Sequence, residues 1–180
     1  MNRFVNSILP QVPGCPQPLI KSEVLRAGIK FCKKSWIWQQ DEEKTVTAGN
    51  DEITFTIPSG AALAGLQLSI DGYAYNTYTR TSLVVTLDSA VNSDTTFQTT
   101  CFLMPARDAT SLPDLLYDDW FEGVESLAKS NLMLMPGKDW YQPQLAKINY
   151  GKYLEDVGNA KIKARKVNDQ SSLMIQQRSW

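Results

Sequence analysis

The sequence contains no histidine among its 180 residues. This absence excludes a Ser-His-Asp triad, a Cys-His pair, a His-ligated zinc site and an imidazole acid or base. Any catalysis would depend on carboxylates, lysine, tyrosine or an unassisted nucleophile. The composition therefore favours a protein that is not an enzyme.

Paired cysteines and long hydrophobic runs are also missing. The three cysteines, Cys15, Cys32 and Cys101, are far apart and form no Cys-x-x-Cys motif. This spacing predicts free thiols in a reducing compartment and no metal site. Apolar runs extend over only a few residues, so we expect no membrane-spanning segment.

Net charge is nearly absent, because 18 Lys and Arg residues oppose 19 Asp and Glu residues. A general nucleic-acid binder normally carries a basic surplus, so this class is disfavoured. The balance hides two segments of opposite sign. Residues 108–125 contain six acids and no base, and residues 151–180 contain six bases and three acids.

These segments supply two candidate surfaces. The acidic face consists of Asp118, Asp119, Glu122 and Glu125, and the basic face consists of Lys161, Lys163, Arg165 and Lys166. Each run taken alone is typical of a solvated helix face. Together, the two faces would also suit neighbouring copies of the chain that meet through opposite charges.

The middle of the chain is rich in threonine and poor in charge. All 13 threonines lie between Thr45 and Thr110, and no lysine occurs between Lys44 and Lys129. Residues 53–57 and 66–70 alternate apolar and polar residues, and the turn pair Asp71-Gly72 follows the second segment. About five or six short strands at this spacing predict a small antiparallel sandwich or barrel.

The flanks have helical periodicity. Apolar residues recur every three or four positions after Pro16, after Ser111 and after Pro143, which predicts three main helices. We therefore expect an α+β fold in which a three-helix bundle is interrupted by an inserted β domain. The expected divisions are an N-terminal arm and first helix (1–44), the β domain (45–110), the rest of the bundle (111–167) and a C-terminal tail (168–180).

Candidate catalytic and ligand-binding sites are weak. Tyr73, Tyr75, Tyr78 and Arg80 would form a stacking face for a sugar or nucleotide, but ordinary strand residues explain them better. Asp118, Glu122 and Glu125 share a helical face, but the sequence offers no further ligands for a metal. We predict no catalytic residue, no cofactor and no metal.

The C-terminal segment combines a polar stretch with a terminal apolar cluster. Such a cluster usually docks on its own domain or on another chain. The residues that we expect to dock, on the same domain or on another chain, are Leu173, Met174, Ile175, Arg178 and Trp180.

Four motifs on the flanks carry a family resemblance. The first flank has residues 9–16 (LPQVPGCP) before a helix that ends in residues 31–36 (FCKKSW). The second flank has residues 132–140 (LMLMPGKDW), followed by residues 143–146 (PQLA) and a basic amphipathic helix. Together they resemble the head–tail connector, or neck adaptor, proteins of tailed bacteriophages. The strand-rich middle matches that family only in position and character.

The resemblance implies a virion protein of the neck, between capsid and tail, that is assembled in the host cytoplasm. About twelve copies would form a ring under the portal protein, with another neck or tail protein below it. The ring would line the channel through which genomic DNA leaves, in non-specific proximity to that DNA. The resemblance implies that the C-terminal tail, Leu173 to Trp180, docks on the portal or along a neighbouring subunit, and it implies no catalytic residue. We expect no membrane partner.

Two placements of the charged faces remain open. The acidic face of one copy can contact the basic face of the next, or the acidic face can line the channel and repel phosphates. A different function, a carbohydrate- or receptor-binding module carried by the β domain, is the main alternative. A carboxylate-based hydrolase is disfavoured, because no paired-acid geometry is visible.

Overall fold

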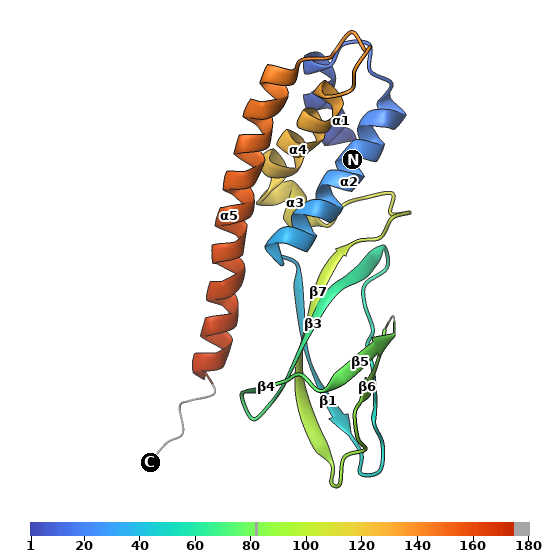
Figure 1. Ribbon diagram of the computed structural model, residues 1–180, viewed down its shortest axis with the longest axis vertical. Coiled ribbons are helices and arrows are strands. Elements are labelled where there is room, and N and C mark those ends of the chain that lie inside the picture. The colour runs from blue at the N-terminus through green and yellow to red at the C-terminus, as the bar shows by residue number, and fades with distance from the viewer. Residues whose placement is uncertain (82, 175–180) are drawn as a thin grey trace.

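In the computed structural model, helices form one end of the molecule and strands form the other (Figure 1). The structure describes residues 1–81 and 83–174. The helices are α1 (Asn2–Ile8), α2 (Gln17–Ser35), α3 (Asp114–Asp118), α4 (Phe121–Met133) and α5 (Pro143–Met174), with a 3-10 turn, η1 (Leu9–Gln11), after α1. The strands are β1 (Gln39–Val46), β2 (Glu52–Thr54), β3 (Ala61–Ile70), β4 (Tyr73–Tyr75), β5 (Tyr78–Thr81), β6 (Val84–Leu87) and β7 (Thr95–Pro105).

Proline starts helix α2 and a left-handed residue ends it. Pro16 precedes the helix in an extended conformation, and Pro18 lies in the first turn, where its missing N–H costs no hydrogen bond. Trp36 adopts a left-handed conformation with φ 55°, and its N–H donates to the carbonyl of Cys32 at 2.9 Å. This cap turns the chain directly from α2 into β1.

Helix α4 forms the centre of the helical end, with α2 and α5 packed against it. Gly123 permits this close packing, because a Cβ atom there would lie 2.8 Å from the Phe31 ring and 2.9 Å from the Asp156 Cβ atom. Phe31 also contacts the buried ring of Tyr153 on α5 edge to face. The three helices thus share one apolar core.

The strands form two antiparallel sheets that pack face to face. The larger sheet has the order β1-β7-β3-β4, and the smaller has the order β2-β6-β5. Their facing side chains bury a second apolar core, which includes Ile53, Leu68, Val85, Phe97 and Leu103. The opposite face of the larger sheet is polar, because its register places threonine and glutamine there.

The two cores meet at the root of the larger sheet. Trp38 contacts both cores, and its carbonyl accepts a hydrogen bond from the N–H of Leu103 at 2.8 Å. Met104 on β7 packs against the helical core. The strand-rich end therefore packs directly against the helical end, to which it is also joined by the chain.

The predicted architecture, three main bundle helices with an inserted β domain, is wrong. The described residues form five α-helices, and their strands form two separate sheets. Helix α1 is too short for its apolar residues to show a clear period in the sequence. The single helix expected after Ser111 is divided into α3 and α4, because Trp120 leaves helical geometry at φ −128° and ψ 26°.

Strand β1 is a second difference from the sequence prediction, which assigned residues 1–44 to an N-terminal arm and first helix. The helix ends at Ser35, and β1 follows it with the sequence QQDEEKTV. No apolar alternation marks this strand. Its side of the sandwich interior carries polar residues, which form the contacts described below.

A search of the described helices for membrane-crossing segments found none of sufficient length and hydropathy.

Candidate functional site

The structure divides the predicted acidic face. Glu125 is buried, where its carboxylate pairs with Lys129 at 3.0 Å and accepts a hydrogen bond from Ser7. Asp119 pairs with Lys163 of the same chain at 2.6 Å. Asp118 and Glu122 are exposed. Only half of the acidic face is therefore both exposed and outside these ion pairs.

The predicted basic face is divided in the same way. Lys163 points toward α3 and α4, where it pairs with Asp119 and lies 5.8 Å from the centre of the Trp120 ring. Lys161, Arg165 and Lys166 are exposed. Within the part of the chain that the structure describes, Lys161 and Arg165 form no ion pair.

Lys161 and Arg165 border a groove of about 370 Å³ between α5, the end of α2 and the polar face of the larger sheet. We call it the basic groove. Its other two cations are Lys33 and Lys34, and no carboxylate belongs to the described residues that line it. The remaining lining residues are Ser35, Trp36, Gln39, Gln67, Phe102 and Ala164.

The wall between α2 and the sheet is aromatic. The rings of Trp36 and Phe102 are stacked, with centroids 4.5 Å apart and planes 24° apart. Phe102 is buried, whereas Trp36 is 50% exposed. The groove thus combines an exposed aromatic face with cationic side chains on two sides.

Local structure explains why these residues meet. The left-handed cap at Trp36 folds its ring back over β7, next to the two lysines of the last helical turn. The register of the sheet places Gln39, Phe102 and Gly65 side by side on neighbouring strands. Because Gly65 has no side chain, the Phe102 ring can lie over β3, where a Cβ would be 3.2 Å away.

The groove contains no set of groups for covalent or acid–base chemistry. Its ionisable groups are four cations, which attract anions but do not form a nucleophile–base pair. Burial raises the pKa of Cys32 to about 12 and that of Cys101 to about 11, so both thiols stay protonated at neutral pH. The arrangement suits electrostatic recognition.

The search for metal ligands covered the described residues. No group of three or more Cys, Asp or Glu side chains there is placed to hold a metal ion.

The three tyrosines of the strands do not form one stacking face. Tyr75 packs edge to face on Phe97 in the sandwich core. The hydroxyl of Tyr78 donates to the carbonyl of Leu66 at 3.2 Å. Tyr73 stands apart as an exposed residue, with 79% of its surface accessible.

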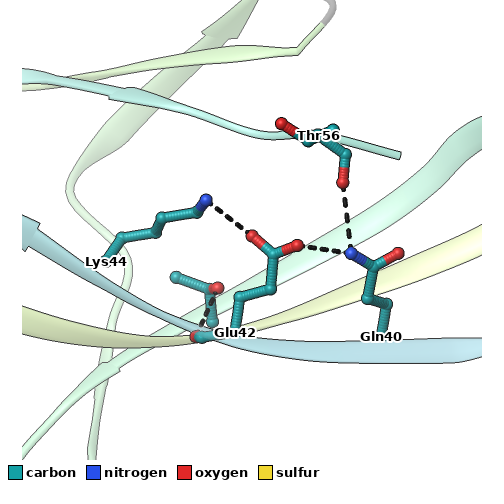
Figure 2. Close-up of polar contacts among 5 residues, drawn as sticks. Gln40, Glu42, Lys44 and Thr56 are labelled. Carbon is teal, nitrogen blue, oxygen red and sulfur yellow. Dashed lines mark hydrogen bonds and ion pairs between the residues drawn. The ribbon is translucent and has the colours of Figure 1, made fainter. Parts of the chain in front are cut away.

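A separate polar cluster lies at the β1 side of the sandwich (Figure 2). The Glu42 carboxylate pairs with Lys44 at 2.7 Å and accepts a hydrogen bond from the Gln40 amide, which also donates to the carbonyl of Thr56 at 3.1 Å. The hydroxyl of Thr99 donates to the Glu42 carbonyl at 2.7 Å. Hydrogen bonding to Lys44 lowers the pKa of Glu42. These contacts tie β1 to its neighbours.

The predicted docking tail begins within α5, which continues to Met174 and so includes Leu173 and Met174 in its backbone. Ile175, Arg178 and Trp180 lie outside the described residues.

Sequence reasoning found Lys161 and Arg165 but missed the other half of the groove. Lys33, Lys34 and Trp36 occur in the FCKKSW motif, where they read as an ordinary helix end. A tryptophan two residues after a helix-terminal lysine pair was the available signal, but the partner Phe102 lies 66 positions away along the chain.

Comparison of the sequence with models of known protein families gave no match. Comparison with curated protein sequences also gave no match.

Proposed function

We propose that this protein is a structural connector of a tailed-phage neck, which assembles into a ring between the portal vertex and the tail. The proposal rests on the resemblance of the two flanks and on a surface of α5 suited to protein contacts. Without catalytic groups in its groove, the described part of the chain fits a role in assembly.

The observation that carries the proposal is the apolar surface that α5 leaves exposed. Ile148 and Ile162 are 57% and 55% exposed, and they lie on the side of α5 opposite its buried stripe. Leu145 and Leu154 flank that stripe on its two sides and are also exposed. Exposed apolar side chains on the solvent side of a helix are candidate contacts for another chain.

The charge distribution supports contacts between unlike surfaces. Asp118 and Glu122 remain exposed on one side, and Lys161, Arg165 and Lys166 remain exposed on α5. A contact between two different surfaces repeats from copy to copy, and it closes into a ring when the rotation between copies permits. Asp119 and Lys163 already neutralise each other within one chain, so they add little to such a contact.

The mass of the assembled protein tests this function. Native mass spectrometry and negative-stain microscopy of the purified chain are expected to show rings of about twelve copies. Mixing with purified portal rings is expected to give a stable co-sedimenting complex. A protein that stays monomeric at high concentration, both alone and with portal rings, would contradict the proposal.

The hypothesis of a contact through the basic face has its own test. Reversing Lys161 and Lys166 to glutamate is expected to abolish rings, because like charges would then face each other. Lys21→Glu with Lys138→Glu is a matched control, since these lysines are also exposed and lie outside α5. Normal rings from the first variant would reject the basic face as a contact.

A further inference from the structure

The basic groove has an excess of positive charge that the described residues lining it do not balance. Lys33 and Lys34 come from the end of α2, and Lys161 and Arg165 come from successive turns of α5. Four cations beside one groove repel each other, and a bound anionic group would relieve that repulsion. This concentration is notable in a chain with a net charge of −1.

The lining of the groove favours a loop of a protein over a nucleic-acid backbone. Trp36, Phe102 and Ala164 provide apolar surface, and Gln39 and Gln67 provide amides that can bond to a peptide backbone. A phosphodiester would satisfy the cations but would leave this apolar surface without a partner. The matching ligand is an acidic segment that also carries an exposed aromatic or apolar side chain.

The strand-rich end of the same chain presents such a segment. The loops that follow β1, β3 and β6 carry four aspartates and no lysine or arginine; the loops after β1 and β6 form the lower end of Figure 1, and the β3–β4 turn lies above them at the left. We call them the distal loops, and their acids are Asp51, Asp71, Asp88 and Asp94. The antiparallel order places these loops at the same end of their strands, because β1 and β3 end near the level where β7 begins, and β2 begins where β6 ends.

Hydrogen bonds hold most of the distal loops in place. The N–H of Val91 donates to the carbonyl of Asn50 at 3.0 Å, and the N–H of Gly49 donates to the carbonyl of Val91 at 2.9 Å. The Asp94 carboxylate accepts from the N–H of Ala48 at 2.9 Å. A surface ordered in advance loses less conformational entropy when it binds.

Tyr73 supplies the aromatic side chain. It directly follows the Asp71-Gly72 turn, whose positive φ values of 52° and 83° are those of a tight hairpin. At 79% it is the most exposed large hydrophobic side chain in the described structure. A tyrosine on a rigid turn, beside a carboxylate, has the chemistry of a binding hot spot.

The groove does not receive the distal loops of its own chain. None of the described residues of these loops lines the groove, and Tyr73 of the same chain is 79% exposed. The groove is therefore left open to the distal loops of a second copy.

We propose that the basic groove of one copy binds the distal loops of the next copy, with Tyr73 against the Trp36–Phe102 stack and the aspartates against Lys33, Lys34, Lys161 and Arg165. This inference rests on the self-association of the proposed function, and it identifies one contact through which copies join. The contact is between unlike surfaces, so it propagates from copy to copy.

Two variants, each altered on one surface only, test the contact. The groove variant, Lys161→Glu with Arg165→Glu, keeps its distal loops, and the loop variant, Tyr73→Ser with Asp88→Asn, keeps its groove. Each is expected to associate at least about tenfold more weakly than the unaltered chain in sedimentation velocity experiments. Lys21→Glu with Lys138→Glu has the same charge change as the groove variant, at exposed lysines outside α5 and the groove, and is expected to associate normally.

Mixing the two variants gives a sharper result. The groove of the loop variant and the distal loops of the groove variant are both intact, so one such contact can form between them. The expected product is a one-to-one heterodimer that grows no further through this contact. A mixture that stays monomeric while the unaltered chain associates would overturn the inference.

The outcomes separate this inference from the proposed function. An unaltered chain that never associates contradicts both. Association that the groove and loop variants leave unchanged overturns only the inference. If a single-stranded DNA oligonucleotide binds the unaltered chain and not the groove variant, while association is unchanged, the groove is a phosphate site and the inference is also overturned.

Discussion

The helical end and the strand-rich end of the molecule use ion pairs differently. In the helical end, Glu125 and Lys129 pair at 3.0 Å with side chains only 10% and 9% exposed. In the strand-rich end, Glu42 and Lys44 pair at 2.7 Å but are 20% and 30% exposed. The Glu–Lys pair is therefore largely excluded from water in the helical end and partly hydrated in the strand-rich end. We expect the free energy of unfolding to depend more strongly on the pair that is more deeply buried.

The largest expected effect breaks the helical pair at one partner. Lys129→Met leaves the Glu125 carboxylate buried without its cation, so the free energy of unfolding should fall by about 3–5 kcal/mol. Chemical denaturation measures this change. Lys44→Met in the strand-rich end should cost less than about 1 kcal/mol, because water partly solvates Glu42. Equal losses from the two variants would contradict the comparison.

A matched control separates the lost cation from the lost packing. In the double variant Glu125→Gln with Lys129→Met, no buried charge remains, and much of the lost stability should return. If the double variant is as unstable as Lys129→Met, the effect comes from packing around Lys129 and not from an uncompensated carboxylate.

The second prediction compares glycines in two neighbouring helices. Gly123→Ala should destabilise the protein by about 1–3 kcal/mol, because the new Cβ would lie 2.8 Å from the Phe31 ring and 2.9 Å from the Asp156 Cβ atom. Gly158 on α5 has no neighbour within 4 Å, so Gly158→Ala should raise stability by about 0.5–1 kcal/mol through helix propensity. Thermal unfolding of the two variants gives the signs. A stabilising Gly123→Ala would show that α4 and α5 are not in close contact there.

The two ends of the molecule also differed in how far the sequence predicted them. The stripe of Ile20, Val24 and Phe31 marked α2 because its buried face is mostly apolar. No such pattern marked β1, since Gln40, Glu42 and Lys44 occupy its inner side and satisfy each other by hydrogen bonds and charge. A strand stabilised by polar contacts has no hydrophobic period to detect.

The candidate site was predictable in part for a similar reason. A run of charge shows which residues carry it, but not which of them meet within the chain. Lys163 and Asp119 belonged to the two predicted faces, yet they pair with each other, and Glu125 pairs inside α4. The groove depends on Trp36 reaching Phe102, a contact between distant segments that only the fold creates.

The smallest expected effect compares the pH dependence of two carboxyl groups, one from each end. In the strand-rich end, hydrogen bonding to Lys44 lowers the pKa of Glu42 below its ordinary 4.5. In the helical end, burial raises the pKa of Asp156 above its ordinary 3.8, with further contributions from Glu122 and Glu155. A lowered pKa means that the ionised carboxylate stabilises the fold, and a raised pKa means that it destabilises the fold.

The two variants should therefore change the pH profile of stability in opposite directions. The contribution of Glu42 is complete above pH 4.5 and is lost as the pH falls through its lowered pKa, so Glu42→Gln should lower stability at neutral pH and little in strong acid. Ionised Asp156 costs stability as the pH rises above 3.8 and through its raised pKa, so Asp156→Asn should raise stability at neutral pH and not below pH 3.8. Urea unfolding from pH 3 to pH 7 measures both, with changes of about 1 kcal/mol or less. If both variants shift stability in the same direction at neutral pH, the ionised carboxylates of Glu42 and Asp156 have the same effect on stability. The comparison between the two regions then fails.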